Sequence, residues 1–242
     1  MQGITYALAL SVACCATSLA AQSQPDFSGV WRSYTEPGQQ PQRLSTSPTA
    51  SLPLKEHAKA KVEEYQALVS PLGETPGGMC VGTGMPGSMM GSGGYPMEIM
   101  QRPDQINIVY EAHNEIRRVY FGDKVIPQED RLPARNGYSV GRWEGDRLIV
   151  VTDALKEAVD QLYPHSENAI LTEEYSLSAD GQVLTAKLTI EDPDWYSQTF
   201  TAEKKWQLEP GGRVMPYECT EPMWEARLEE LRAQAGLSAE NQ

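Results

Sequence analysis

Alternation of apolar and polar side chains is clearest in residues 137–152, where the chain reads GYSVGRWEGDRLIVVT. Successive side chains of residues 138–143 fall on opposite faces of an extended segment. Residues 144–147 supply a glycine-containing turn, and the largely β-branched run LIVV follows at 148–151. Two extended segments around such a turn predict a β-hairpin.

Similar runs recur along the rest of the chain, separated by short polar or glycine-containing breaks. With the hairpin and a first strand near Val30, they predict about nine or ten strands joined mostly by turns, which indicates an all-β antiparallel meander. Closure removes the edge strands of a meander, so we expect a barrel of about 8–10 strands with room for a small ligand. Two packed sheets fit the pattern as well. The runs are 97–102, 105–112, 115–121, 169–178, 182–191, 198–208 and 213–219.

Two segments carry helical patterns. Between Leu54 and Val69 apolar residues recur at steps of three and four, which predicts an amphipathic helix. Residues 222–236 predict a charged C-terminal helix. The side chains expected to dock that helix are Met223, Trp224, Leu228 and Leu231.

Residues 77–96 form a glycine- and methionine-rich segment, and no regular element is expected there. Residues 77–100 contain eight glycines and six methionines. Met85 and Met89, together with Cys80, are candidate soft ligands for Cu(I). Methionine also fills apolar gaps, and glycine gives a segment conformational freedom, so packing or a flexible lid over the barrel is the favoured interpretation.

The N-terminal residues resemble a targeting segment. Residues 4–20 are apolar and small, and cleavage after Ala20 predicts a signal peptide at 1–20 and a single domain at 21–242. Lipidation at Cys14 is the alternative to that cleavage. Either route exports the protein, so we expect a periplasmic or secreted location.

Two cysteines, Cys80 and Cys219, lie outside the targeting segment. An even pair in an oxidising compartment favours a disulfide. Two free thiols, or a metal-bound Cys80, are the alternatives.

The formal net charge is −13 at pH 7. Nucleic acid and anionic membranes call for clustered Lys and Arg, so these partners are not expected. No second long apolar run predicts a membrane span. No motif indicates a cofactor, and the oligomeric state is left open by the sequence.

Three ordered motifs carry a resemblance to a known family: GYSVGRWEGD at 137–146, PHS at 164–166 and TIEDP at 189–193. They resemble a large family of uncharacterised secreted bacterial proteins with the patterns G-[HY]-S-[IV]-G-x-W-E-G-D, P-H-S and T-I-D-D-P. Arg147 departs from the threonine that is usual in that family. The resemblance covers residues 27–219 and implies a lipocalin-like barrel exported to the periplasm or beyond, without implying a known reaction.

Acid–base chemistry has one candidate centre. His165 lies in a polar connection between predicted strands, where an imidazole can act as a general acid or base near neutral pH. Glu174, Asp192 and Glu98 are its candidate orienting partners. The favoured alternative is a structural ion pair, in which one of these acids pairs inside the barrel with Arg117, Arg118 or Arg142.

Ser139 lies within a formal G-x-S-x-G match, but a nucleophile there needs a strand-to-helix elbow, and a strand continues on both sides. The favoured function is therefore binding of a small, partly apolar molecule in the barrel. An enzyme using His165 and a periplasmic copper binder are the alternatives. The candidate binding residues combine charged groups with aromatic groups that have a polar tip, and they are Glu98, Tyr110, Tyr138, Arg142, Trp195 and Tyr196.

Overall fold

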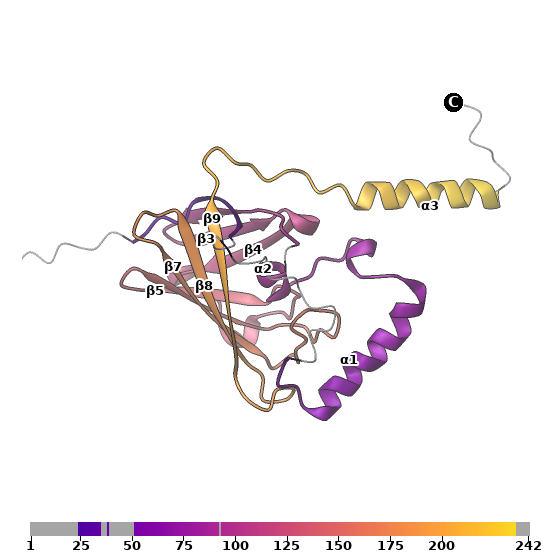
Figure 1. The fold of residues 1–242 in the computed structure, drawn as a ribbon, viewed down its shortest axis with the longest axis horizontal. Coiled ribbons are helices and arrows are strands. Elements are labelled where there is room, and N and C mark those ends of the chain that lie inside the picture. The colour runs from indigo at the N-terminus through magenta and orange to yellow at the C-terminus, as the bar shows by residue number, and fades with distance from the viewer. Residues whose placement is uncertain (1–23, 35–37, 39–50, 92, 236–242) are drawn as a thin grey trace, which may run out of the picture.

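A computed structural model describes residues 24–34, 38, 51–91 and 93–235 (Figure 1). The predicted signal peptide lies outside these residues. Within the described part, nine strands form a closed barrel in which each strand pairs with the next and β9 pairs with β1. The strands are β1 (Gly29–Ser33), β2 (Met97–Arg102), β3 (Gln105–Tyr110), β4 (Glu115–Tyr120), β5 (Tyr138–Glu144), β6 (Arg147–Asp153), β7 (Ile170–Leu177), β8 (Val183–Glu191) and β9 (Phe200–Leu208).

The prediction of a closed, mostly antiparallel barrel is confirmed. The β5–β6 hairpin pairs Glu144 with Arg147 around the turn, as its pattern indicates. One strand pair differs, because β4 and β5 run parallel, with Val119 opposite Ser139. The connection 121–137 has 17 residues, about three times the median loop length of roughly 4–6 residues, and it brings the start of β5 beside the end of β4, so that the two strands run in the same direction.

The strand predicted at 213–219 is wrong. Residues 211–219, which we name the strap, carry no ladder pairing. The backbone N–H of Met215 donates to Glu111 (2.8 Å), and that of Tyr217 donates to the side chain of Asn114 (3.2 Å). Because the β1–β9 pair already closes the barrel, these N–H groups bond to side chains of the β3–β4 turn instead of to another strand.

The two predicted helices lie where the sequence places them, but one of them does not make the contacts expected of it. The early helix is α1 (Glu56–Val69), which buries Ala58 and Val62, and the C-terminal helix is α3 (Thr220–Gln234). The expected docking of α3 is wrong for most of the helix, because none of its residues, all of which are described, is buried, although the Sδ of Met223 lies 3.1 Å from the sulfur of Cys80. A short helix that the sequence did not indicate, α2 (Gly87–Met90), lies in the methionine-rich segment. Single 3₁₀ turns are η2 (Ser70–Leu72), η3 (Gly77–Met79), η4 (Ala112–Asn114), η5 (Gly122–Lys124) and η6 (Gln128–Asp130).

Large side chains fill much of the barrel interior. Trp31 and Trp206 are at most 2% exposed, and the indole of Trp31 donates to the carbonyl of Phe27 (2.9 Å). Truncating a buried tryptophan of this kind to alanine costs about 3–5 kcal/mol. The apolar packing surrounds a group of charged and hydroxyl side chains, and that group is the starting point for the site.

Candidate functional site

A buried ion pair crosses the barrel interior from β4 to β7. Arg117 is 1% exposed and Glu173 is fully buried. Nη1 and Nη2 of Arg117 each donate to one carboxylate oxygen of Glu173 at 2.7 Å, which is the bidentate geometry of a strong charge-assisted pair. The favoured sequence interpretation, a structural ion pair with an inward arginine, is therefore confirmed for one of its three candidate arginines, Arg117, but its candidate acids are wrong.

Alternation along β7 explains the difference. Leu171, Glu173 and Tyr175 point inward, so Glu174 lies on the outer wall, where it bonds to Arg147 (2.8 Å). A shift of one residue moves a strand side chain to the other face.

Hydroxyl groups complete the hydrogen bonds of the pair. Nε of Arg117 donates to Ser139 (3.0 Å), and Nη2 donates to Thr152 (2.7 Å). The hydroxyl of Tyr175 donates to Glu173 (2.6 Å). Ser139 is thus a buried structural partner of an arginine, consistent with rejecting it as a nucleophile.

Burial decides the protonation states in this network. Burial lowers the pKa of Arg117, but the attraction and hydrogen bonds of Glu173, together with the neighbouring phenols of Tyr175 and Tyr110, outweigh burial and leave that pKa raised. Burial also raises the pKa of Tyr110 to about 12 and the pKa of Tyr175 well above its usual value. Both phenols are therefore neutral donors at physiological pH, and the two opposite charges compensate each other.

Residues 82–91, which include α2 and which we name the plug, bring methionine side chains onto this network. Met85 and Met89 are at most 1% exposed. The Sδ of Met89 lies 3.1 Å from the hydroxyl of Tyr175, and the Sδ of Met85 lies 4.0 Å from that of Tyr110. Thioether sulfur is a weak acceptor, and Tyr175 already donates its one hydroxyl hydrogen to Glu173, so only the contact between Tyr110 and Met85 is a weak hydrogen bond.

Glu115 fixes the plug to the barrel. Its carboxylate accepts the backbone N–H of Thr83 (3.1 Å) and of Gly84 (2.9 Å), and it also accepts the hydroxyl of Ser88. Gly84 has a φ of +75°, and a Cβ there would lie 2.5 Å from the carbonyl oxygen of Arg135. The tight approach therefore requires glycine at this position.

A pocket of about 150 Å³ lies between the plug and the β3–β4 turn. Tyr110 connects it to the buried network, since this side chain lines the pocket and lies near both Met85 and Arg117. We call this pocket the mouth pocket. Its lining residues are Thr83, Ser88, Gly91, Gly93, Tyr95, Tyr110, Ala112, His113 and Glu115.

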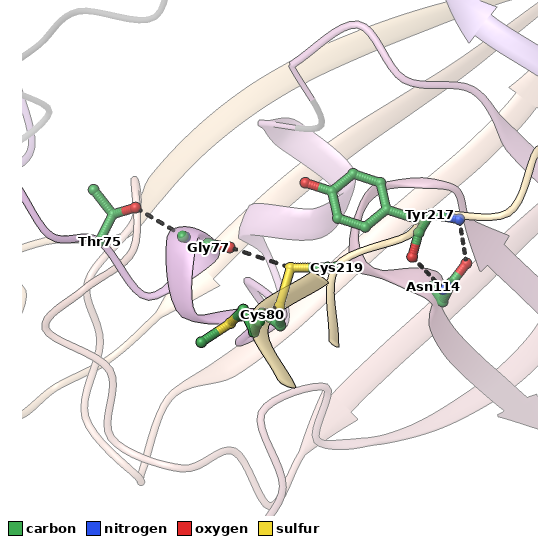
Figure 2. Close-up of a disulfide and its surroundings, with 8 residues drawn as sticks. Thr75, Gly77, Cys80, Asn114, Tyr217 and Cys219 are labelled. Carbon is green, nitrogen blue, oxygen red and sulfur yellow. Dashed lines mark hydrogen bonds between the residues drawn. A yellow bond between two sulfur atoms is a disulfide. The ribbon is translucent and has the colours of Figure 1, made fainter. Parts of the chain in front are cut away.

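The strap and a disulfide border the plug. Figure 2 shows the bond between Cys80 and Cys219, which are 139 residues apart, and the paired hydrogen bonds of Asn114 with Tyr217. The predicted disulfide is confirmed. Because both sulfurs are bonded, Cys80 has no thiolate to offer a metal ion.

The candidate acid–base residues are only partly brought together. His165 is fully buried, with Nδ1 bonded to the carbonyl of Tyr163 (3.0 Å) and no hydrogen-bond partner for Nε2 among the described residues. Desolvation lowers its pKa. Asp192 lies near enough to oppose that lowering, but its carboxylate accepts the hydroxyl and N–H of Ser166 (2.8 and 2.7 Å) and the N–H of Trp195 (3.1 Å). These bonds make Asp192 the acceptor that organises a turn.

The candidate binding residues are dispersed. By strand alternation Glu98 faces outward, between inward Met97 and Ile99. Tyr138 stacks on Tyr120 at 5.0 Å, and exposed Arg142 bonds to neighbouring Glu144. Of the six candidates, Tyr110 alone lines the mouth pocket.

Trp195 and Tyr196 are buried near the start of α1, and the hydroxyl of Tyr196 donates to the carbonyl of Pro164 (3.0 Å). Tyr196 borders a second, more open pocket of about 510 Å³. Lys55, Glu191 and Asp192 also line that pocket, so acidic and basic groups of opposite charge are mixed there.

Glu173 and Glu115 are the acids that the sequence reasoning missed. The signal for Glu173 was available, because it alternates with the apolar residues Leu171 and Tyr175. No comparable signal marks Glu115, because its partners are backbone N–H groups of a segment without regular structure.

Scans against protein-family models and curated proteins found no match. The described residues contain no group of three His, Cys, Asp or Glu side chains that could hold a metal ion. No helix among them is long and apolar enough to cross a membrane.

Proposed function

We propose that this protein is an exported single-domain barrel that binds a small, uncharged, partly apolar molecule in the mouth pocket. The observation that carries the proposal is the position of Tyr110. Tyr110 lines the pocket, and the acceptor recorded for its buried hydroxyl is a thioether sulfur 4.0 Å away. An oxygen acceptor on a ligand gives this donor a stronger partner, since a buried donor with a poor partner costs about 1–3 kcal/mol.

The charges around the pocket favour an uncharged ligand. Arg117 is neutralised by Glu173, so it offers little net attraction to an anion. Glu115 is occupied by the hydrogen bonds of the plug. We therefore expect the mouth pocket to select its ligand by shape and by one hydrogen bond from Tyr110.

The volume of the pocket limits the size of the ligand. A pocket of about 150 Å³ is below the roughly 300–1,000 Å³ typical of drug-sized ligands. It is comparable to a cavity of about 150 Å³ that holds one benzene ring. A monocyclic or short-chain compound fits this volume, and a carbonyl or hydroxyl oxygen on it can accept the hydrogen bond of Tyr110.

The disulfide supports export. Disulfides persist in oxidising compartments and are rare in the cytosol. A periplasmic or secreted location is also what the apolar segment at 4–20 predicts, and membership of the secreted family stays a prediction from the motifs.

The other two functions stay predictions without added support. Catalysis by His165 lacks a free carboxylate partner, because Glu174 is on the outer wall and Asp192 is engaged by the Ser166 turn. Copper binding through Met85 and Met89 lacks the Cys80 thiolate.

The test is native mass spectrometry of the protein isolated from the cell envelope of the organism that makes it. We expect an added mass of roughly 80–200 Da, consistent with the pocket volume, that disappears on denaturation. The Tyr110→Phe variant should carry less of it, and Tyr138→Phe, which alters an outer-wall phenol, should carry as much as the wild type. An unchanged adduct in Tyr110→Phe, or no adduct in folded wild-type protein, contradicts the proposal.

A further inference from the structure

Helix α3 presents an apolar stripe that the described barrel does not cover. Trp224, Leu228 and Leu231 follow one another at steps of four and three, so they lie on one face. Trp224 is 59% exposed and Leu231 is 39% exposed. Figure 1 shows α3 lying away from the barrel, attached at its N-terminal end.

The attachment is confined to the first turn. Cys219 precedes the helix and is bonded to Cys80, and the Sδ of Met223 lies 3.1 Å from the sulfur of Cys80. The remaining turns project from this anchor. Their direction is therefore set by a covalent bond, while their apolar face is left without a partner in the described part of the chain.

A helix in this position gains from a partner. Isolated helices of about 12–15 residues are marginal in water, and most helical stability in proteins comes from packing of one face. α3 has 15 residues and no buried side chain. Covering the stripe stabilises the helix and removes an exposed tryptophan from water.

The charges along one edge of the stripe are self-complementary. Glu225 and Arg232 lie on the same edge, one in each half of the helix. When a second α3 packs against the stripe in antiparallel orientation, Glu225 of each copy falls opposite Arg232 of the other. Arg227, on the other edge, is paired with Glu230 of its own helix.

We propose that two copies of this chain associate through antiparallel packing of α3. Trp224, Leu228 and Leu231 form the apolar centre, and two symmetric Glu225–Arg232 pairs fix the orientation. The antiparallel arrangement places the two anchoring disulfides at opposite ends of the helix pair, about 28 Å apart along its axis, which keeps the barrels separate. Such a twofold, self-complementary contact is the commonest form of protein dimer.

The size of the contact predicts its strength. One face of a 15-residue helix is well below the roughly 800 Å² per partner of a standard interface. We therefore expect a dissociation constant on the order of 10–100 µM, in a dimer that forms on concentration and dissociates on dilution.

The test is sedimentation velocity of the full mature protein with its disulfide intact, across about 2–200 µM. Wild type should shift from monomer to dimer over that range. Glu225→Arg and Arg232→Glu should each raise the dissociation constant about tenfold, because each converts two attractive pairs into repulsive ones. The double variant with both changes restores opposite charges and should regain affinity within about threefold of wild type.

Glu230→Arg is the matched control, since it makes the same charge change as Glu225→Arg on the opposite face of the helix. It should leave the dissociation constant within about twofold of wild type. A protein that stays monomeric at every concentration overturns the proposal. The same holds if Glu230→Arg weakens the dimer as much as Glu225→Arg does, or if the double variant is no better than the single ones.

Discussion

Replacing Glu173 with glutamine removes the negative half of the buried ion pair and leaves the guanidinium of Arg117 uncompensated. Both side chains are at most 1% exposed, and two hydrogen bonds of 2.7 Å join them. Breaking a buried pair from one side costs about 3–5 kcal/mol, because the remaining charge stays desolvated. This cost is a large share of the roughly 5–15 kcal/mol that stabilises a typical domain.

The chain supplies a control at the next position. Glu174→Gln removes a carboxylate that is 39% exposed and paired with Arg147, and exposed pairs contribute about 0–1 kcal/mol. The two substitutions are chemically identical and one residue apart. Their difference in stability therefore measures burial and pairing alone.

The assay is urea unfolding followed by tryptophan fluorescence, since Trp31 and Trp206 are buried in the barrel. With a slope of about 2–3 kcal/mol per M, Glu173→Gln should lower the midpoint by about 1–2 M, and Glu174→Gln by less than about 0.5 M. Equal effects of the two substitutions refute the inward orientation of Glu173.

A paired substitution covers the case in which Glu173→Gln yields no folded protein. Replacing Arg117 with methionine and Glu173 with leucine removes both charges together. Apolar replacement of a whole buried pair is often neutral or stabilising, so this double variant should recover most of the lost stability. Failure of the double variant to exceed Glu173→Gln contradicts the ion-pair explanation.

Three further predictions concern the plug, the buried histidine and the disulfide. Glu115→Gln should speed amide exchange at Thr83 and Gly84 by about 10–100-fold, because it weakens charge-assisted hydrogen bonds of about 1.5–3 kcal/mol. The control is Glu111→Gln, which alters an acid that contacts the strap and should leave amide exchange at Thr83 and Gly84 unchanged. Desolvation lowers the pKa of His165 in the folded state, so the unfolded chain binds its proton first and stability should fall as pH drops below about 6.5. The free energy of unfolding, measured in urea at neutral and acidic pH, should depend less on pH in His165→Asn than in the wild type. The control His57→Asn, which alters an exposed residue of α1, should keep the pH dependence of the wild type. Replacing Cys80 and Cys219 together with serine should lower the free energy of unfolding by up to about 5 kcal/mol, measured by the same assay; an unchanged value contradicts a structural role for the bond.

The barrel could be predicted because strand patterning is local. Alternation and turn residues identify β5 and β6 from the sequence alone, and the number of strands favours closure, although two packed sheets fit the same pattern. The parallel pairing of β4 with β5 could not be predicted in this way, because it depends on the course of the 121–137 connection. The strap was mistaken for a strand because its local pattern does not reveal that its N–H groups bond to side chains of the β3–β4 turn, about 100 residues earlier, and not to another strand.

The site was predicted less well because it depends on long-range contacts. Arg117 and Glu173 are 56 residues apart, and a shift of one position separates the inward acid from its exposed neighbour Glu174. For the methionine-rich segment, apolar packing or a flexible lid was the favoured prediction and a copper ligand set the alternative, and the burial of Met85 and Met89 agrees with packing. The side chains of this segment enter the barrel, held by Glu115, whose role no local pattern reveals.

The central claim, binding of a small uncharged molecule beside Tyr110, is tested most directly by an NMR titration of the mature protein with cyclohexanone. This probe has one ring and one acceptor oxygen, and cyclohexanecarboxylate is its charged counterpart. The account predicts saturable shifts confined to the plug, Tyr110 and the β3–β4 turn, with affinity about tenfold weaker in Tyr110→Phe, unchanged in Tyr138→Phe, and weaker for the carboxylate. Shifts that are absent, that lie elsewhere, or that are the same in Tyr110→Phe contradict it.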